Sequence, residues 1–191
     1  MTHSNIAVFA SGTGSNFVAI MEAIELGKLD ATVSLLVCDK PEVKVLEKAE
    51  RYGVPVFAFQ PKSYPSKQAF EQEIVAQLTE ANVAWIVLAG YMRLIGQTLL
   101  DAYPSKIVNI HPSLLPAFPG LDAIGQALQA GVQVTGVTIH YVDAGMDTGK
   151  IIAQQALSIE PEEDRTSLQQ RIQTIEHYLY PQTIQHLLND K

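Results

Sequence analysis

The sequence predicts an α/β protein: a Rossmann-like open, mostly parallel twisted sheet with helices on both faces and an antiparallel C-terminal strand extension. Three observations support this fold class. Short apolar runs alternate with segments of helical spacing through the first half of the chain, as right-handed βαβ crossovers require. A glycine-rich turn directly follows the first apolar run. In the second half, two strand-like segments are joined by a turn alone, which predicts an antiparallel pair.

The first half contains apolar runs typical of buried strands, separated by segments in which apolar residues recur at helical spacing. Phe17, Ile20 and Ile24 illustrate that spacing, and Gly27 follows them as a plausible C-cap. The expected strands are residues 6–10, 33–37, 56–59, 84–89 and 107–110, and the expected helices are residues 17–24, 42–52 and 70–78.

The second half opens with a proline-rich stretch. Pro112, Pro116 and Pro119 lie within residues 112–123, which we expect to form an ordered loop. Pro181 falls inside the last helical pattern, so we expect it to kink or interrupt the closing helix. The expected elements are a helix over residues 125–131, strands over 134–142 and 150–159 with a turn over 143–149, and a helix from about residue 166.

The composition argues against some classes of function. The chain has 191 residues, 47% of them apolar, and a net charge of −7 from 13 Lys and Arg against 20 Asp and Glu. This length predicts a single domain over residues 1–191 whose core needs no disulfide or metal. Lys and Arg form no cluster, which argues against a nucleic-acid binder and against a binder of anionic membranes.

Cysteine usage and apolar run lengths bear on the compartment. Cys38 is the only cysteine, so neither an intramolecular disulfide nor a cysteine-based zinc site can form. The longest apolar run, residues 83–89, is far too short to cross a bilayer. Residues 1–5 lack the basic start of a signal peptide. We therefore expect a cytoplasmic protein.

The motif Gly12-Thr-Gly-Ser-Asn16 lies between the first strand and the first helix. Glycines let the backbone approach a ligand, and the helix N-terminus that follows offers free N–H groups and the positive end of the helix dipole. The motif therefore indicates a phosphate site. The alternative is a tight structural turn that Ser15 or Asn16 caps.

This motif is not a complete nucleotide-binding signature. Phe17 occupies the third glycine position of the dinucleotide fingerprint, and no Gly-Lys-Ser/Thr sequence makes a P-loop. Asp39, after the second strand, could still bind a ribose. A nicotinamide-dependent enzyme therefore stays open as an alternative.

Asn109 and His111 lie two residues apart at the C-terminal end of a predicted strand, so their side chains emerge on the same side. Open α/β sheets bind ligands at this end of their strands. His offers acid–base chemistry near neutral pH, and Asn offers an amide donor for a developing oxyanion. The pair therefore indicates catalysis, and the alternative is two polar groups that anchor the proline loop.

The turn over residues 143–149 contains Asp143 and Asp147, and its spacing does not match a calcium-binding EF-hand. Either aspartate can cap the turn, or one of them can lie against His111 and hold it protonated or oriented.

Three further residues have competing interpretations. Arg93, beyond the most apolar strand, is either a clamp for a ring-bearing ligand or a surface cation. Glu176 lies on the last helix, where a solvated face is the default. His140 receives no functional role.

Taken together, four motifs resemble the phosphoribosylglycinamide formyltransferases, a family of the formyl-tetrahydrofolate transferase superfamily. The resemblance covers essentially the whole chain. It implies transfer of the formyl group of 10-formyltetrahydrofolate to the amine of glycinamide ribonucleotide, in de novo purine biosynthesis, giving formylglycinamide ribonucleotide and tetrahydrofolate. The motifs are Ser-Gly-Thr-Gly-Ser-Asn at 11–16, Gly-Tyr-Met-Arg-Leu-Ile at 90–95, Asn-Ile-His-Pro-Ser-Leu-Leu-Pro at 109–116 and Met-Asp-Thr-Gly at 146–149.

The resemblance also implies roles for individual residues. The substrate phosphate would lie in a loop with Gly14, Ser15 and Asn16, and Glu176 would contact the glycinamide end. No metal is implied, and the partners are the two substrates, with no nucleic acid or membrane and a possible homodimer. The folate pocket would contain Lys67, Met92, Arg93, Leu94, Ile95 and Asn109, and the catalytic group would be Asn109, His111 and Asp147. The halves 1–100 and 101–191 would serve phosphate binding, and catalysis with folate binding, respectively.

Other members of the superfamily fit less well. Methionyl-tRNA formyltransferases add a C-terminal domain that helps to hold tRNA, and formyltetrahydrofolate deformylases carry a further domain before the glycine loop. The length and acidity of this chain favour neither. A hydrolase of formyltetrahydrofolate and a non-catalytic nucleotide-binding domain remain the alternatives. Departures from the pattern are Asp122 and Ile124, where some relatives have histidines, and Lys150, which replaces a common proline.

Overall fold

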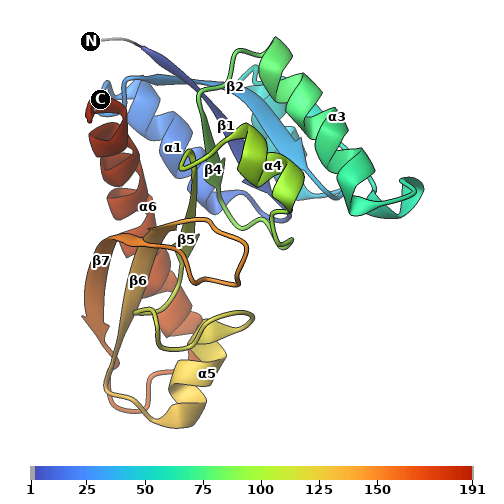
Figure 1. Ribbon diagram of the computed structural model, residues 1–191. Helices are drawn as coiled ribbons and strands as arrows, with labels where there is room; N and C mark the ends of the chain where they lie inside the picture. The colour runs from blue at the N-terminus through green and yellow to red at the C-terminus, as the bar shows by residue number, and fades with distance from the viewer. Residues whose placement is uncertain (1–2, 191) are drawn as a thin grey trace.

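A computed structural model describes residues 3–190 and confirms the predicted fold class. In this part of the chain, seven strands form one sheet in the order β3-β2-β1-β4-β5-β6-β7 (Figure 1). The first five pair in parallel, and β6 and β7 add an antiparallel extension. The strands are β1 (Ser4–Ala10), β2 (Ala31–Cys38), β3 (Val56–Ala58), β4 (Trp85–Leu88), β5 (Ile107–His111), β6 (Val134–Tyr141) and β7 (Ile151–Ser158).

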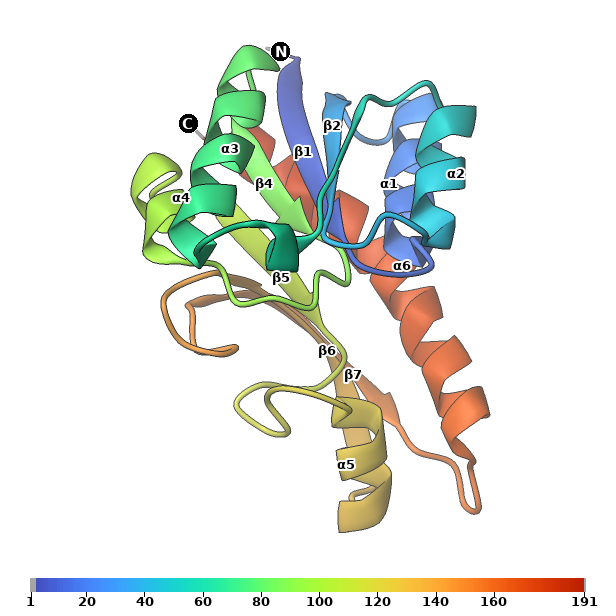
Figure 2. The ribbon, with the colours of Figure 1, turned by 90° about the vertical axis from the view of Figure 1, so that its right-hand side faces the viewer.

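Helices cover both faces of the parallel part of the sheet (Figure 2). One core cluster joins the sheet to α1, α2 and α6, and a second joins it to α3 and α4 on the opposite face. The helices are α1 (Ser15–Glu25), α2 (Lys44–Arg51), α3 (Lys67–Glu80), α4 (Gln97–Ala102), α5 (Ala123–Ala130) and α6 (Arg165–Asn189).

The central strand β1 shows why its sequence is a continuous apolar run. Ile6, Val8 and Ala10 point into the cluster with α1 and α6, whereas Ala7 and Phe9 point into the cluster with α3. Successive side chains of a strand alternate between faces, and a parallel sheet covered on both sides buries all of them. The run therefore carries no polar alternation.

Two elements were not predicted: the short helix α4 and a 3₁₀ turn at Pro61–Ser63. The backbone N–H of Gly96, the N-cap residue of α4, donates to the carboxylate of Glu71 in α3, 2.6 Å away. A helix of six residues is too short to be stable alone, so its start depends on this distant carboxylate. Local sequence carries no signal of that kind.

Of the two outcomes expected at Pro181, a kink or an interruption, the interruption was wrong, because α6 continues to Asn189. A proline removes one helical hydrogen bond, but the packing of the apolar face can offset that loss. Tyr180, next to the proline, is fully buried, and its hydroxyl donates to the carbonyls of Leu88 in β4 (2.8 Å) and Val108 in β5 (3.1 Å). The second half of α6 is thus fixed to the centre of the sheet.

Within residues 3–190, no helix has the length and apolar character that a membrane crossing needs. The same part of the chain contains no group of three or more His, Cys, Asp or Glu side chains arranged to hold a metal ion.

Candidate active site

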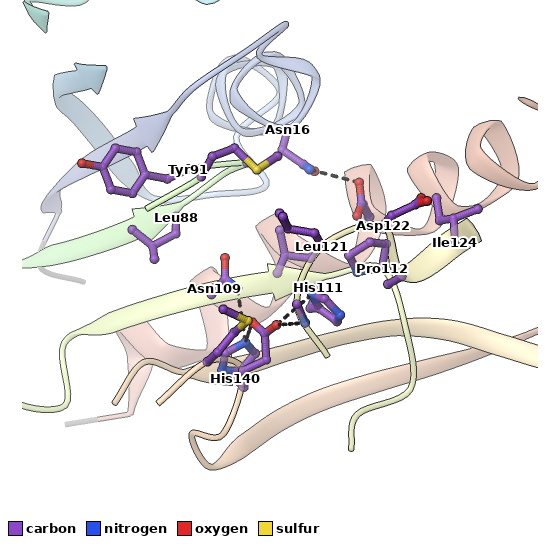
Figure 3. A pocket seen from close by; sticks show the side chains of 18 of the residues that line it. Asn16, Leu88, Tyr91, Asn109, His111, Pro112, Leu121, Asp122, Ile124 and His140 are labelled. Atoms are coloured by element: carbon purple, nitrogen blue, oxygen red, sulfur yellow. Dashed lines mark hydrogen bonds and ion pairs between the residues drawn. The ribbon is translucent and has the colours of Figure 1, made fainter. Parts of the chain in front are cut away.

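A cavity of about 430 Å³ opens where β1, β4 and β5 end (Figure 3). The direction of strand addition reverses between β1 and β4, and open α/β sheets bind ligands at such a switch point. The volume lies within the usual range of about 300–1,000 Å³ for small-molecule sites. The cavity takes residues from both halves of the chain, from Asn16 in α1 to Glu176 in α6.

The glycine loop turns sharply from β1 into α1. Gly14 has a φ of 73° and is the N-cap residue of α1, and no side chain caps the helix. A cap by Ser15 or Asn16, the structural alternative, was therefore wrong. A Cβ at Gly14 would lie 2.5 Å from Val45 Cγ2, so close packing, as well as the positive φ, requires a glycine at this position. Gly14 and Ser15 do not line the cavity, whereas Asn16 does.

Asn16 and Glu176 meet at one end of the cavity, and both are 8% exposed. The Asn16 Nδ2 group donates to Glu176 Oε2 at 3.1 Å, while Asn16 Oδ1 has no hydrogen-bond partner among the described residues. Burial raises the pKa of Glu176 to about 7, against the opposing effect of the Asn16 bond. The solvated face expected by default at Glu176 was wrong.

Asn109 and His111 project together from the end of β5, as their spacing predicted (Figure 3). The Nε2 atom of His111 lies 2.9 Å from the carbonyl oxygen of Phe118. Its Nδ1 atom lies 3.5 Å from Asp147 Oδ2. The Nε2 atom is thus engaged by the loop, whereas Nδ1 has no hydrogen bond within the described residues and faces Asp147 as an ion-pair partner when the ring is protonated.

Asp147 connects three segments of the site. It has a φ of 56°, and its Oδ2 atom accepts the backbone N–H of Gly120 at 2.7 Å. Burial alone would raise the pKa of Asp147, but the His140 ring, the Gly120 amide and the His111 ring together lower it. Asp143, in contrast, accepts the Gly145 N–H at 3.0 Å and so caps the turn. The alternative left open between the two aspartates is thus decided: Asp147 faces His111.

The proline-rich stretch forms a loop, as predicted, with no helix or strand over residues 112–122, and it is anchored to β6. Thr138 in β6 donates its hydroxyl to the carbonyl of Ser113 at 2.7 Å and accepts the Leu115 N–H at 3.0 Å. Gln154 in β7 adds a bond of 2.9 Å to the Leu115 carbonyl. These contacts hold Phe118, whose carbonyl faces His111.

His140 is the residue that the sequence interpretation missed. Its Nε2 atom lies 3.2 Å from Asn109 Nδ2 and 3.6 Å from Asp147 Oδ1. It is paired with Asn109 across the antiparallel β5–β6 ladder. Because side chains alternate along β6, His140 lies on the other face of the strand from Val137 and Ile139, which enter the core. Only the register between β5 and β6 places His140 beside Asn109. The sequence contains no signal for that register.

The mouth of the cavity is apolar. Four large apolar residues there are 49–76% exposed, which is unusual for one small area of a surface. They are Met92, Leu94, Leu121 and Met146. Ile95 also lines the cavity but is buried.

Two charged residues expected near a ligand are placed differently. Lys67 does not line the cavity, and its Nζ lies 4.0 Å from Glu71 Oε1. Arg93 lines the cavity, and its Nε donates to Asp39 Oδ2 at 2.9 Å. Ser11 binds the other oxygen of Asp39, and Asp39 is buried and does not line the cavity, so the interpretation of Asp39 as a ribose ligand was wrong.

Comparison with known proteins finds a matching family, similar sequences and similar solved structures. Residues 4–184 match the family described as formyl transferase. The chain is 59% identical over 182 residues to a phosphoribosylglycinamide formyltransferase of Bacillus subtilis, covering 95% of this chain and 93% of that protein. It is 40% identical over 186 residues to the trifunctional purine biosynthetic protein adenosine-3 of Drosophila melanogaster, covering 96% of this chain but 14% of that protein. The crystal structure of glycinamide ribonucleotide transformylase 1 from Geobacillus kaustophilus superposes with a TM-score of 0.96 at 60% identity, over 98% of this chain and all of that one.

Proposed function

The chain belongs to the formyl transferase family, and on that premise we propose that it transfers a formyl group from 10-formyltetrahydrofolate to the amine of glycinamide ribonucleotide. The products are formylglycinamide ribonucleotide and tetrahydrofolate. The observation that carries this proposal is the convergence of Asn109, His111 and Asp147 at one cavity, because a module that only binds nucleotides does not need this group. The names of the similar proteins select the acceptor.

The acceptor's phosphate binds at the N-terminus of α1 in this proposal. No side chain caps that helix, so its first N–H groups and the positive end of its dipole are available to an anion. Ser15 adds a hydroxyl donor beside them. The glycinamide end then extends toward Asn16 and Glu176, where a carboxylate and the unpartnered Oδ1 of Asn16 both accept hydrogen bonds from an amine or amide.

The family implies a folate-type formyl donor, and we propose 10-formyltetrahydrofolate itself as the cosubstrate. The residues at the cavity mouth fit such a molecule. The exposed Met92, Leu94, Leu121 and Met146 offer the apolar surface that a flat ring system covers, and methionines adapt well to aromatic faces. Arg93 lines the same region and supplies a cation. Lys67 lies outside the lining, so its contribution would be restricted to a part of the donor that extends beyond the cavity.

Asn109, His111 and Asp147 form the reacting end. Attack of the amine on the formyl carbon places negative charge on the formyl oxygen. The Asn109 amide and the protonated His111 ring donate to that oxygen, and one donor of this kind typically lowers a barrier by about 3–4 kcal/mol. The Asp147 carboxylate, 3.5 Å from His111 Nδ1, is positioned to pair with the protonated ring. Asp147 also accepts the amine's proton through water before the proton passes to the leaving nitrogen of the folate.

We place this reaction in the cytoplasm and in a single domain over residues 1–191. The oligomeric state, a monomer or a homodimer, is measured by analytical ultracentrifugation.

The decisive experiment is a spectrophotometric assay of formyl-folate consumption with and without glycinamide ribonucleotide. We expect consumption that depends on the ribonucleotide and yields its formylated product. Equal consumption without the acceptor would identify a hydrolase. No consumption in either case would leave a binding module.

A further inference from the structure

Residues 90–96, which we call the rim loop, connect β4 to α4 and carry Met92, Arg93 and Leu94 at the cavity mouth. Ser11, the first residue after β1, binds this loop twice. Its N–H donates to the Gly90 carbonyl at 3.1 Å, and its hydroxyl oxygen accepts the Met92 N–H at 2.9 Å. Ser11 is therefore the contact between the glycine loop and the rim loop.

Asp39, directly after β2, completes this contact. Its side chain is 3% exposed. The Oδ1 atom accepts the Ser11 hydroxyl at 2.5 Å, and Oδ2 accepts Arg93 Nε at 2.9 Å. One buried carboxylate thus holds both the serine that binds the rim loop and the arginine that the rim loop carries.

The chemistry of the two donors explains why a carboxylate is present. The Ser11 oxygen already accepts a bond from Met92, so its hydrogen needs an acceptor elsewhere. The Arg93 Nε–H also needs an acceptor, because a guanidinium cannot accept. An asparagine has one acceptor oxygen and one NH₂ group, so it would satisfy one of these donors and face the other with a donor. Only an aspartate satisfies both.

Arg93 keeps donors for a ligand in this arrangement. The bond to Asp39 uses the Nε–H, and the guanidinium has four further N–H groups on its two Nη atoms. The Arg93 side chain is 40% exposed and lines the cavity. Asp39 therefore fixes the edge of the guanidinium that faces the protein and leaves the other edge uncommitted.

We propose that Asp39 is a positioning residue for the formyl-donor pocket: it orients the Arg93 guanidinium and, through Ser11, fixes the rim loop against the glycine loop. This inference rests on the proposed function. It replaces the ribose contact that the position of Asp39 after β2 suggested. Asp39 acts through Arg93 and Ser11 and touches no substrate.

The first test is the steady-state kinetics of Asp39→Asn with both substrates. We expect the KM for 10-formyltetrahydrofolate to rise about ten- to a hundredfold, the range that loss of a charge-assisted hydrogen bond covers. The kcat should change much less, because Asn109, His111 and Asp147 are not in contact with Asp39. Ser11→Ala, which removes one of the two bonds to Asp39, should give a smaller rise in the same KM and serves if Asp39→Asn folds poorly.

The control is Asp30→Asn. Asp30 precedes β2 as Asp39 follows it, and it also has a basic partner, His3, at 2.8 Å, but it is far along the strand from the cavity and partly exposed. We expect its kinetic constants to match the wild type. In the double variant Asp39→Asn with Arg93→Ala, the rise in KM over Arg93→Ala alone should be no larger than the rise that Ser11→Ala gives over the wild type. A fall in kcat at unchanged KM, or additive effects in the double variant, would overturn the inference.

A second readout does not depend on turnover. The Nε–H signal of Arg93 in a ¹H–¹⁵N NMR spectrum, assigned by its loss in Arg93→Lys, should be protected from solvent exchange in the wild type and lose that protection in Asp39→Asn. Unchanged protection would overturn the inference. Failure of the proposed function would appear differently, as a wild-type protein that consumes no formyl-folate in response to glycinamide ribonucleotide while its Arg93 signal is still protected.

Discussion

Glu176, which is buried, and Asp147, which is partly buried, are two carboxylates in the same cavity, and their pKa values move in opposite directions. Burial raises the pKa of Glu176 to about 7. Burial acts on Asp147 in the same sense, yet the pKa of Asp147 is lowered. Glu176 has one neutral donor, Asn16 Nδ2. Asp147 has the Gly120 N–H and two histidine rings within 3.6 Å.

The comparison shows that the surrounding donors, and not burial alone, decide the charge of a carboxylate in this cavity. The end near Asn16 favours a carboxyl group that gains and loses its proton near neutral pH. The end near His111 favours a carboxylate that is ionised at neutral pH. Two titratable groups whose environments separate their pKa values are a common basis for dividing acid–base roles in an active site.

The largest expected effect tests the anionic end. Asp147→Asn keeps the size of the side chain but removes its charge, so the His111 ring loses its ion-pair partner and the site loses the group that accepts the proton of the amine. We expect kcat to fall about 10²–10⁴-fold, the usual contribution of acid–base catalysis, with little change in either KM. Stopped-flow and steady-state rates measured across the neutral pH range would check this.

Asp143→Asn is the matched control, because Asp143 belongs to the same turn and only caps it. It should retain most of the turnover. If Asp143→Asn and Asp147→Asn lost activity equally, the loop would matter only for its shape, and the contrast between the two carboxylates would have no catalytic meaning.

The next largest expected effect is a change in the free energy of unfolding, and it tests Glu176, the carboxyl group whose pKa is raised. Between pH 4.5 and about 7 the folded protein holds a proton on Glu176 that the unfolded chain releases, so this residue lowers the free energy of unfolding as the pH rises. Glu176→Gln has no carboxyl proton to release, so its free energy of unfolding does not fall in this way. At pH 8 the variant should be more stable than the wild type by up to about 3 kcal/mol, from about 1.36 kcal/mol for each pKa unit.

Urea unfolding at pH 4 and pH 8 measures this difference. At pH 4 the two proteins should differ little, because Glu176 is protonated in both states. A stability gap that is the same at both pH values would mean that the charge of Glu176 is not the cause.

Asp147 should show the opposite stability pattern. Its folded pKa is lowered, so its ionised form stabilises the protein above the ordinary pKa of an aspartate and loses that effect as the pH falls through the folded value. We therefore expect Asp147→Asn to be less stable than the wild type at neutral pH and to approach it in acid. A melting-temperature series from pH 3 to pH 7 would check this, and a larger gap in acid would contradict it.

The smallest expected effect concerns the one donor of Glu176. The hydrogen bond from Asn16 Nδ2 lowers the Glu176 pKa. Asn16→Leu removes this bond, so the pKa of Glu176 should rise further. A ¹³C NMR titration of the Glu176 carboxyl group measures the direction. Ser15→Ala, one residue away and outside the cavity lining, should leave the titration unchanged.

The sequence predicted the site where its information is local. The same-side placement of Asn109 and His111 follows from strand periodicity, and their place at a strand end follows from the alternation of strands and helices. The local residues left the choice between Asp143 and Asp147 open, and only the family resemblance selected Asp147, because the choice depends on how a turn closes over a separate loop. His140 was missed for a related reason, since its position beside Asn109 depends on the β5–β6 register.

The same limit explains the errors about charged residues and helices. Glu176 is 160 residues from Asn16 in the sequence, and the two meet only because α6 packs against α1. Asp39 looked like a ribose ligand from its strand alone, but Ser11 and Arg93 occupy it from two other segments. The start of α4 depends on Glu71 in another helix. Each error concerns a contact between segments that no local pattern records.

The course of α6 has a consequence for how this fold can be joined to other proteins. Tyr180 fixes α6 to β4 and β5. The last turns of α6 then run along α1 toward the starts of β1 and β2, where Gln185 accepts the N–H of Asp30, the residue before β2, at 2.6 Å. In both ribbon views the start of β1 and the end of α6 lie at one pole of the molecule, opposite α5 (Figures 1 and 2). A neighbouring module tethered at either end, as in the multifunctional Drosophila protein, would therefore attach at that pole and leave the entrance for substrates unobstructed.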